Sequence, residues 1–336
     1  MRTKGMNTGV RLLFASCWML ACLLVACAGK KPQQEAAEAK PLRLLYWNIQ
    51  NGMWSGQGDN YDAFVRWVNQ QAPDICVWCE AQTIYTTGTA DPMEPAERYL
   101  VDHWPDLAKR YGHSYWYLGG HRDNYPQVIT SKYPIENVAR IVGAEPDSVV
   151  THGAGWARIA IGKDTLNLVS LHTWPQAYAF RAEDQEASKE AHGGDKYRRM
   201  EMEYIVRHTY GSLPDAEGKH WLMMGDFNSR SRVDNATYRY PEDDTRFLVH
   251  DYIKASTPYV DIIAQKYPGQ FKTTTGGEAR IDFVYCTPAL YESIVEADVI
   301  TDDYTRPVRD PRKLSNFWHP SDHRPILVTF DLNKLP

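Results

Sequence analysis

The chain has 336 residues, of which 43% are hydrophobic and 24% are charged. These values are ordinary for a globular protein with a full core, so one large α/β domain or two small ones are expected. The formal net charge is −5, and the first 26 residues carry three basic groups and no acidic one. The rest of the chain is therefore acidic, which excludes a general electrostatic attraction to nucleic acid but not a local basic groove.

The first 26 residues resemble a bacterial lipoprotein signal peptide. A basic start precedes an apolar run at residues 12–26, which is short for a membrane span. The run leads into the sequence LVAC, which resembles a lipobox whose last residue, Cys27, becomes lipidated. The alternative is an uncleaved anchor helix. We expect a signal peptide at 1–26, a lipidated Cys27 with a flexible tether over 27–40, and one domain at 41–336 outside the cytoplasm, on the periplasmic face of a membrane or at the cell surface.

Apolar runs and hydrophobic periodicity predict mixed strands and helices along this domain. In chain order they are a strand at 42–47, a helix at 61–71, a strand at 75–79, a helix at 95–110, strands at 115–118, 127–130, 138–142, 155–161 and 165–171, a helix at 196–210, a strand at 221–224, a helix at 246–254, and strands at 281–286, 294–299 and 326–330. Hairpins mix with helical crossovers in this order, so we predict two packed mixed sheets with helices outside.

Three further segments have features that bear on packing. Residues 181–195 are charged and are predicted to form an exposed insertion. Cys76 and Cys79 have the spacing of a metal or redox half-site, but residues three apart on a strand face opposite ways, so we expect both in the core. In the helix at 196–210, Arg198 and Arg199 are expected on a solvated face. The buried stripe of that helix is predicted to hold Met200, Tyr204, Ile205 and His208.

Polar residues gather at the ends of the predicted strands. One such residue is usually a cap or a turn former. Together, however, carboxylates, amides and imidazoles at several strand ends predict a site, and oxygen ligands of this kind suit Mg²⁺, Mn²⁺ or Ca²⁺ better than zinc. The residues are Asn48, Glu80, His172, Asp226, Asn228, Asp282, Asp322 and His323.

Seven short segments, in order along residues 42–330, resemble the endonuclease/exonuclease/phosphatase superfamily, which includes deoxyribonucleases, abasic-site endonucleases, sphingomyelinases and inositol polyphosphate 5-phosphatases. The resemblance implies an α/β four-layer sandwich and a divalent-metal-dependent hydrolase of phosphate esters. The segments lie at residues 45–50, 73–80, 131–135, 171–173, 225–228, 280–284 and 321–326.

The resemblance also implies a role for each polar residue. A Mg²⁺ ion (or Mn²⁺ or Ca²⁺) would neutralise the phosphate charge, and either Asp226 or the His323–Asp282 pair would be the base. Glu80 follows Cys79, where the family usually has Gln, and we expect metal binding to tolerate this change. The implied metal ligands are Glu80, Asn48 and Asp322, and the implied catalytic residues are His172, Asp226, Asn228, Asp282 and His323.

These observations favour a phosphodiesterase or phosphatase that acts outside the cytoplasm. Acidic charge and the absence of Lys/Arg clusters favour a small or lipid-linked phosphate ester over duplex DNA. The alternatives are an extracytoplasmic endonuclease or exonuclease, with nucleic acid as substrate, and a non-catalytic binding lipoprotein. The complete set of site residues argues against the last alternative. We expect a monomer attached to a membrane through its N-terminal lipid.

Overall fold

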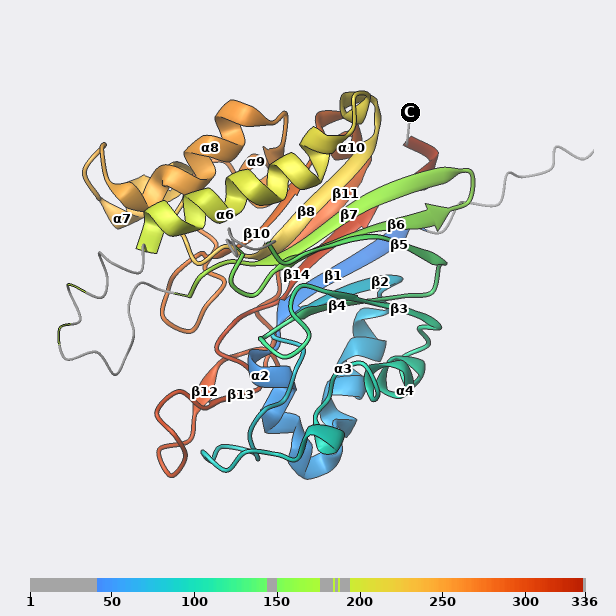
Figure 1. The fold of residues 1–336 in the computed structure, drawn as a ribbon, viewed down its shortest axis with the longest axis vertical. Helices are drawn as coiled ribbons and strands as arrows, with labels where there is room; N and C mark the ends of the chain where they lie inside the picture. The colour runs from blue at the N-terminus through green and yellow to red at the C-terminus, as the bar shows by residue number, and fades with distance from the viewer. Residues whose placement is uncertain (1–40, 144–149, 176–183, 185–186, 188–193, 335–336) are drawn as a thin grey trace, which may run out of the picture. The chain divides into compact units, whose positions relative to one another are not determined.

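The computed structural model describes residues 41–143, 150–175, 184, 187 and 194–334. The expected signal peptide, Cys27 and the tether lie outside the described residues, as does most of the predicted insertion at 181–195. Two six-stranded sheets form the centre of the described part (Figure 1). Within these ranges, no helix combines the length and the apolar character that crossing a membrane requires.

The first sheet has the strand order β11-β14-β1-β2-β4-β3. Its strands β1 and β2 are parallel, and the helix α3 connects them, whereas the other neighbours are antiparallel. Helices α3 (Asp62–Gln71) and α4 (Trp104–Lys109) cover its outer face (Figure 1). The strands are β1 (Leu42–Asn48), β2 (Ile75–Cys79), β3 (Tyr115–Gly119), β4 (Gln127–Ser131), β11 (Ile294–Val299) and β14 (Ile326–Phe330).

The second sheet has the order β5-β6-β7-β8-β10-β9, in which β7 and β8 are the parallel pair. Helices α6 (Gly194–His208) and α8 (Leu248–Ser256) pack on its outer face (Figure 1). Three short helices complete this half: α7 (Asn235–Tyr238), α9 (Ile262–Lys266) and α10 (Pro288–Tyr291). The strands are β5 (Ile135–Ile141), β6 (Ala154–Ile161), β7 (Asp164–His172), β8 (His220–Asp226), β9 (Val260–Asp261) and β10 (Asp282–Cys286).

The two sheets pack face to face, and strand alternation explains how each face is filled. On β1, Leu44 and Tyr46 point into the core between the sheets, whereas Leu45 and Trp47 point at the helices. Cys79 lies in the core between the sheets and Cys76 under the helices, so their side chains face apart as predicted. The α/β four-layer sandwich predicted from sequence is confirmed.

Two helix predictions need correction. The helix expected at 95–110 is wrong over its first half, because α4 begins only at Trp104, with Pro105 in its first turn. Proline fits the first turn of a helix but breaks an interior, so the helix cannot extend back through this position. The predicted buried stripe of α6 is right at Ile205 but wrong at Met200, which is 53% exposed, while Arg198 and Glu201 are buried instead.

Short irregular segments follow the end of β1 and precede the start of β14. The segment after β1 contains the short helix α2 (Gln50–Met53). A two-stranded ribbon that the sequence did not predict precedes β14 and pairs β12 (Val308–Arg309) with β13 (Trp318–His319). The backbone N–H of Trp318 donates to Gln50 Oε1 at 3.2 Å, so the ribbon is fastened to the segment that follows Asn48.

Candidate active site

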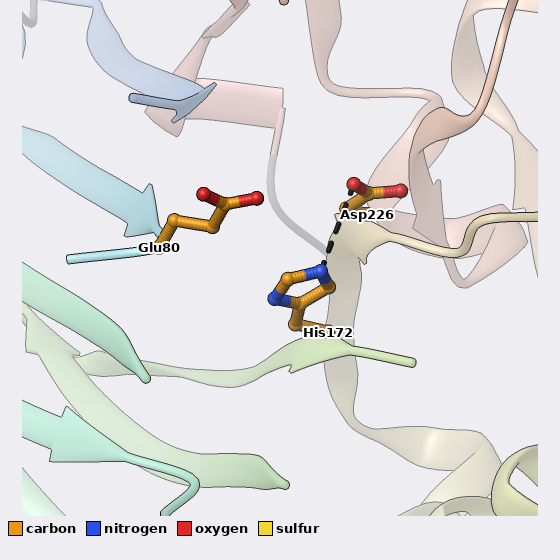
Figure 2. A group of neighbouring side chains, drawn as sticks. All are labelled: Glu80, His172 and Asp226. Carbon is orange, nitrogen blue, oxygen red and sulfur yellow. Dashed lines mark ion pairs between the residues drawn. The ribbon is translucent and has the colours of Figure 1, made fainter. Parts of the chain in front are cut away.

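The carboxyl ends of four strands bring the predicted site residues together. In the first sheet, the end of β1 lies beside the end of β2, since Asn48 aligns with Cys79. In the second sheet, His172 at the end of β7 aligns with Asp226 at the end of β8. Parallel neighbours end at the same edge of a sheet, so each sheet contributes one pair of functional residues. Figure 2 shows Glu80, His172 and Asp226 pointing toward one another.

Asn48 joins the two sheets through its side-chain amide. Its Nδ2 donates to Glu80 Oε1 at 3.2 Å and to Asp226 Oδ2 at 3.1 Å, while its Oδ1 accepts the backbone N–H of Gln50 at 3.0 Å. The side chain is buried, so these bonds are shielded from competing water. A single amide therefore fixes the spacing between a carboxylate of the first sheet and a carboxylate of the second.

Asp226 Oδ2 is the centre of the cluster. His172 Nε2 and His323 Nε2 each lie 3.8 Å from this oxygen. That separation is too long for a direct hydrogen bond, so each ring nitrogen can still reach another group, such as a phosphate oxygen. Burial is the main cause that raises the pKa of Asp226, and the charge of Asp282 adds to it.

His323 and Asp282 form a buried ion pair. His323 Nδ1 donates to Asp282 Oδ2 at 2.7 Å, and the Tyr46 hydroxyl donates to the other oxygen of Asp282 at 2.6 Å. Burial alone would lower the pKa of His323, but the charges of Asp282 and Asp322 raise it well above its usual value. The ring is therefore charged at neutral pH and presents Nε2–H as a donor.

His172, unlike His323, is neutral at neutral pH. Its Nδ1 lies 3.4 Å from the carbonyl oxygen of Tyr125, an acceptor that places the proton on Nδ1. Burial is the main cause that lowers the pKa of His172 to about 3; the Tyr125 carbonyl acts against it and the charge of His323 acts with it. The two imidazoles beside Asp226 thus differ, since one is neutral and the other is a cation.

Asn228 and Asp322 border this cluster. The backbone N–H of Asn228 donates to Asp226 Oδ1 at 2.9 Å, and its side-chain amide donates to the Thr173 carbonyl at 3.2 Å. Asp322 Oδ1 lies 3.9 Å from His323 Nε2 and has no hydrogen-bond partner among the described residues. Asn228 and Glu80 both adopt left-handed backbone conformations, with φ of 46° and 55°.

The donor set fits a hard divalent cation. Among the described residues, one group of possible ligand atoms comes from Glu80, His172 and Asp226, all within 4.8 Å of one another, and another comes from Asp226, Asp282 and His323. The second group is already occupied by the charged His323 and its partner, which leaves the carboxylate of Glu80 as the better ligand. Asp322 belongs to neither group, but its unpaired oxygen lies beside them.

Sequence reasoning missed several supporting residues. Tyr46 precedes Asn48 by two positions on β1 and reaches Asp282, whereas Ser321 donates to the Asn48 carbonyl at 2.8 Å. Both lie inside segments already singled out for other residues, so their position was a usable signal. Arg198, expected on a solvated face, is instead buried and donates to the carbonyls of Trp174 and Pro175.

The fold and this cluster define a class of protein. Residues 45–323 match the Endonuclease/Exonuclease/phosphatase family, so the chain belongs to this family of phosphoester hydrolases. Its structure is similar to that of an AP endonuclease from Archaeoglobus fulgidus, with 17% identity, a TM-score of 0.56, and coverage of 87% of this chain and 100% of that chain.

Two further structures have the same fold. TDP2 of D. rerio, complexed with single strand DNA product, has 14% identity and a TM-score of 0.53, and the match covers 87% of this chain and 99% of that chain. The humanized D. rerio TDP2 with 14 mutations has 15% identity and a TM-score of 0.52, over 86% of this chain and 98% of that chain. No curated protein matches the sequence. At these identities the structural likeness shows the fold alone.

Proposed function

We propose that this protein is a divalent-metal-dependent hydrolase of phosphate esters that acts outside the cytoplasm, held at a membrane by a lipid on Cys27. One observation carries the catalytic part of the proposal. Asp226 Oδ2 lies 3.1 Å from the amide of Asn48 and 3.8 Å from both a neutral and a charged imidazole. A carboxylate base, a neutral imidazole that can relay a proton and an anion-binding cation are thus gathered around one atom.

Glu80, Asn48 and Asp322 would hold the metal ion at the open side of this cluster. Glu80 is half-buried and Asp322 retains an unpaired oxygen, so both can still take a ligand. A bound Mg²⁺, Mn²⁺ or Ca²⁺ supplies Lewis-acid stabilisation of the negative charge that develops on the phosphate. Asn48 keeps the ligand carboxylate at a fixed distance from Asp226, which orients the phosphate relative to the base.

Different side chains accept and donate the protons of the reaction. Asp226 is placed to be the base for the attacking water, because Asn48 and the backbone N–H of Asn228 hold its carboxylate at the centre of the cluster. His323, held charged by Asp282, donates to a phosphate oxygen, as does the amide of Asn228. The arriving phosphate charge raises the pKa of His172, so that its Nε2 takes up a proton from solvent and passes it to the leaving oxygen as the ester bond breaks.

The acidic charge of the chain supports a small or lipid-linked phosphate ester as substrate. One observation favours the alternative, an extracytoplasmic nuclease. The ribbon formed by β12 and β13 is basic, and it is fastened beside the site through Gln50. The sequence prediction that the chain lacks Lys/Arg clusters overlooked this segment. Its exposed cations are Arg306, Arg309, Arg312 and Lys313, of which Arg312 is paired with Asp310.

The proposal is tested by a metal-dependent activity panel. The substrates are bis-p-nitrophenyl phosphate, p-nitrophenyl phosphate, plasmid DNA, single-stranded DNA and sphingomyelin, each with Mg²⁺, Mn²⁺ or EDTA. Glu80→Ala and His323→Ala should abolish turnover, whereas Asp106→Ala, which removes an exposed carboxylate paired with Lys109, should not change it. Turnover that survives EDTA or both site substitutions would refute the proposed chemistry.

The location is tested separately in cells. Wild-type protein should fractionate with membranes and incorporate labelled palmitate, and Cys27→Ala should shift it out of the membrane fraction without label. Protein that stays soluble and unlabelled in both forms would exclude the lipid anchor while leaving the hydrolase proposal intact.

A further inference from the structure

A second buried histidine lies directly against His172. The rings of His152 and His172 are stacked, with centroids 4.2 Å apart and planes at 27°. His152 is 5% exposed and lies in the bend just before β6, whereas His172 is the last residue of β7. We propose that His152 is a positioning residue, which holds the plane of the His172 ring so that Nε2 of His172 faces Asp226 and the scissile phosphate. This inference rests on the proposed function.

The hydrogen bonds of His152 fix its tautomer. Its Nδ1 lies 3.1 Å from both the carbonyl oxygen and the side-chain Oδ1 of Asn124. The amide nitrogen of Asn124 donates to the Thr151 carbonyl at 2.9 Å, which orients its Oδ1 toward the imidazole. Both partners of Nδ1 are acceptors, so Nδ1 carries the proton and Nε2 carries a lone pair. Among the described residues, this Nε2 has no hydrogen-bond partner.

One loop holds both rings. Asn124 binds His152, and the carbonyl of the next residue, Tyr125, is the partner of His172 Nδ1. His121 belongs to the same loop, and its backbone N–H donates to the His152 carbonyl at 2.9 Å. The loop therefore sets the two imidazoles as a unit, and a shift of one ring is transmitted to the other.

The helix α6 fastens the same two segments from the other side. Glu201 accepts the backbone N–H of Thr151 and that of Trp174, each at 2.7 Å. Thr151 directly precedes His152, and Trp174 follows His172 by two positions. The carboxylate of Glu201 is buried, so these two bonds are shielded and bind the strand ends that carry the stacked pair.

His172 needs this support because its own bonds are weak. The contact of its ring with the Tyr125 carbonyl is 3.4 Å long, and Asp226 is 3.8 Å away, so neither contact fixes the rotation of the ring. An aromatic stack restricts that rotation, and a neutral neighbour does so without placing a second positive charge beside the ring. A misplaced proton donor costs turnover while ground-state binding remains, since the donor acts on the leaving oxygen.

A double-mutant cycle on turnover tests whether His152 acts through His172. His152→Ala should lower kcat by about 10- to 100-fold with little change in KM or in Mg²⁺ affinity. In a His172→Ala background the same substitution should lower kcat by less than about twofold. His152→Phe, which keeps the stack and loses the bonds to Asn124, should recover part of the loss. His208→Ala, which removes a stacked histidine on the exposed side of α6, is the matched control and should leave kcat unchanged.

The outcomes separate this inference from the proposed function. If His152→Ala still lowered kcat by the full 10- to 100-fold in the His172→Ala background, the positioning role would be overturned. It would also be overturned if His152→Ala changed only KM and the melting temperature and left kcat unchanged. Side-chain ¹⁵N spectra give a readout that needs no turnover: wild type should show the Nδ1–H tautomer at both rings, and His152→Ala should broaden or shift the His172 signals. An Nε2–H tautomer at His152 would overturn the inference even in an active enzyme. Wild-type protein with the expected spectra but no hydrolysis of any substrate would instead refute the proposed function.

Discussion

The two sheets contribute unlike halves to the site. The half from the first sheet, Asn48 and Glu80, ends in a half-buried carboxylate with room for a ligand. The half from the second sheet, His172, Asp226 and Asp282, is buried, and burial is the main cause of the shifted pKa values of His172 and Asp226. This difference shows that metal binding and proton transfer require different surroundings. A metal site must remain accessible to the ion and the substrate, whereas the shifted pKa values of the proton-transfer groups depend on the exclusion of water.

Asp282→Asn should give the largest effect and should fall on the second half alone. Without the carboxylate, His323 loses the charge that raises its pKa and the partner that fixes its tautomer. We expect kcat to fall by about 10³-fold at neutral pH, with Mg²⁺ affinity unchanged in calorimetric titration. An equal loss of metal affinity would mean that the two halves are not separable.

The helical layers outside the two sheets should respond to pH in opposite directions. On the first side, His113 bonds Thr130 and the Pro73 carbonyl, and burial lowers its pKa from 6.5 to about 4. The folded ring stays neutral while the unfolded ring gains a proton, so stability falls as the pH drops from about 6.5 to 4, by up to about 3 kcal/mol. His113→Gln should remove this slope in urea unfolding at pH 7 and pH 5. An unchanged slope would exclude His113 as its source.

On the second side, Glu201 should have the reverse effect. Burial raises its pKa from 4.5 to about 7, against the backbone donors of Trp174 and Thr151. The folded state keeps a proton that the unfolded state releases, so stability falls as the pH rises from about 4.5 to 7, by up to about 3 kcal/mol. Glu201→Gln should flatten the curve in this window. If wild type and variant show parallel curves, the carboxylate is already ionised in the folded protein.

Glu80→Gln should have a smaller effect that is confined to the first half. The substitution keeps the shape of the side chain but removes its charge, so Mg²⁺ affinity should fall by about 100-fold. Because the buried half is intact, kcat at saturating metal should recover to within about tenfold of wild type. Failure of excess Mg²⁺ to restore turnover would show that Glu80 also takes part in the chemistry.

The sequence predicted strands and strand-end residues well because both depend on local patterns. Continuous apolar runs such as Ile75–Cys79 mark strands buried on both faces. The face of α6 was not predictable in this way, since its buried side carries Arg198 and Glu201, whose partners are backbone groups distant in sequence. Apolar periodicity therefore placed Ile205 correctly but missed the buried polar residues of this face.

His152 was missed because no local pattern singles it out. Its neighbour, His172, is known only once the β6–β7 hairpin is in register, with Ala154 opposite Leu171. The two-residue turn at Gly162 and Lys163 sets that register, and extending the pairing by one step places His172 beside the residue after His152. Tertiary bonds from the loop at Asn124 and from α6 then complete the contact, and these depend on the whole fold.

The left-handed backbone at Glu80 has a consequence for laboratory evolution. A non-glycine residue in this conformation costs about 1 kcal/mol that glycine would not, so the ligand position stores strain. Under the proposed function, Glu80→Gly would remove this strain and the metal ligand together, so a library screened only for heat resistance would not select against loss of the metal. Catalysis is then the requirement that places a carboxylate at a position where the backbone conformation favours glycine.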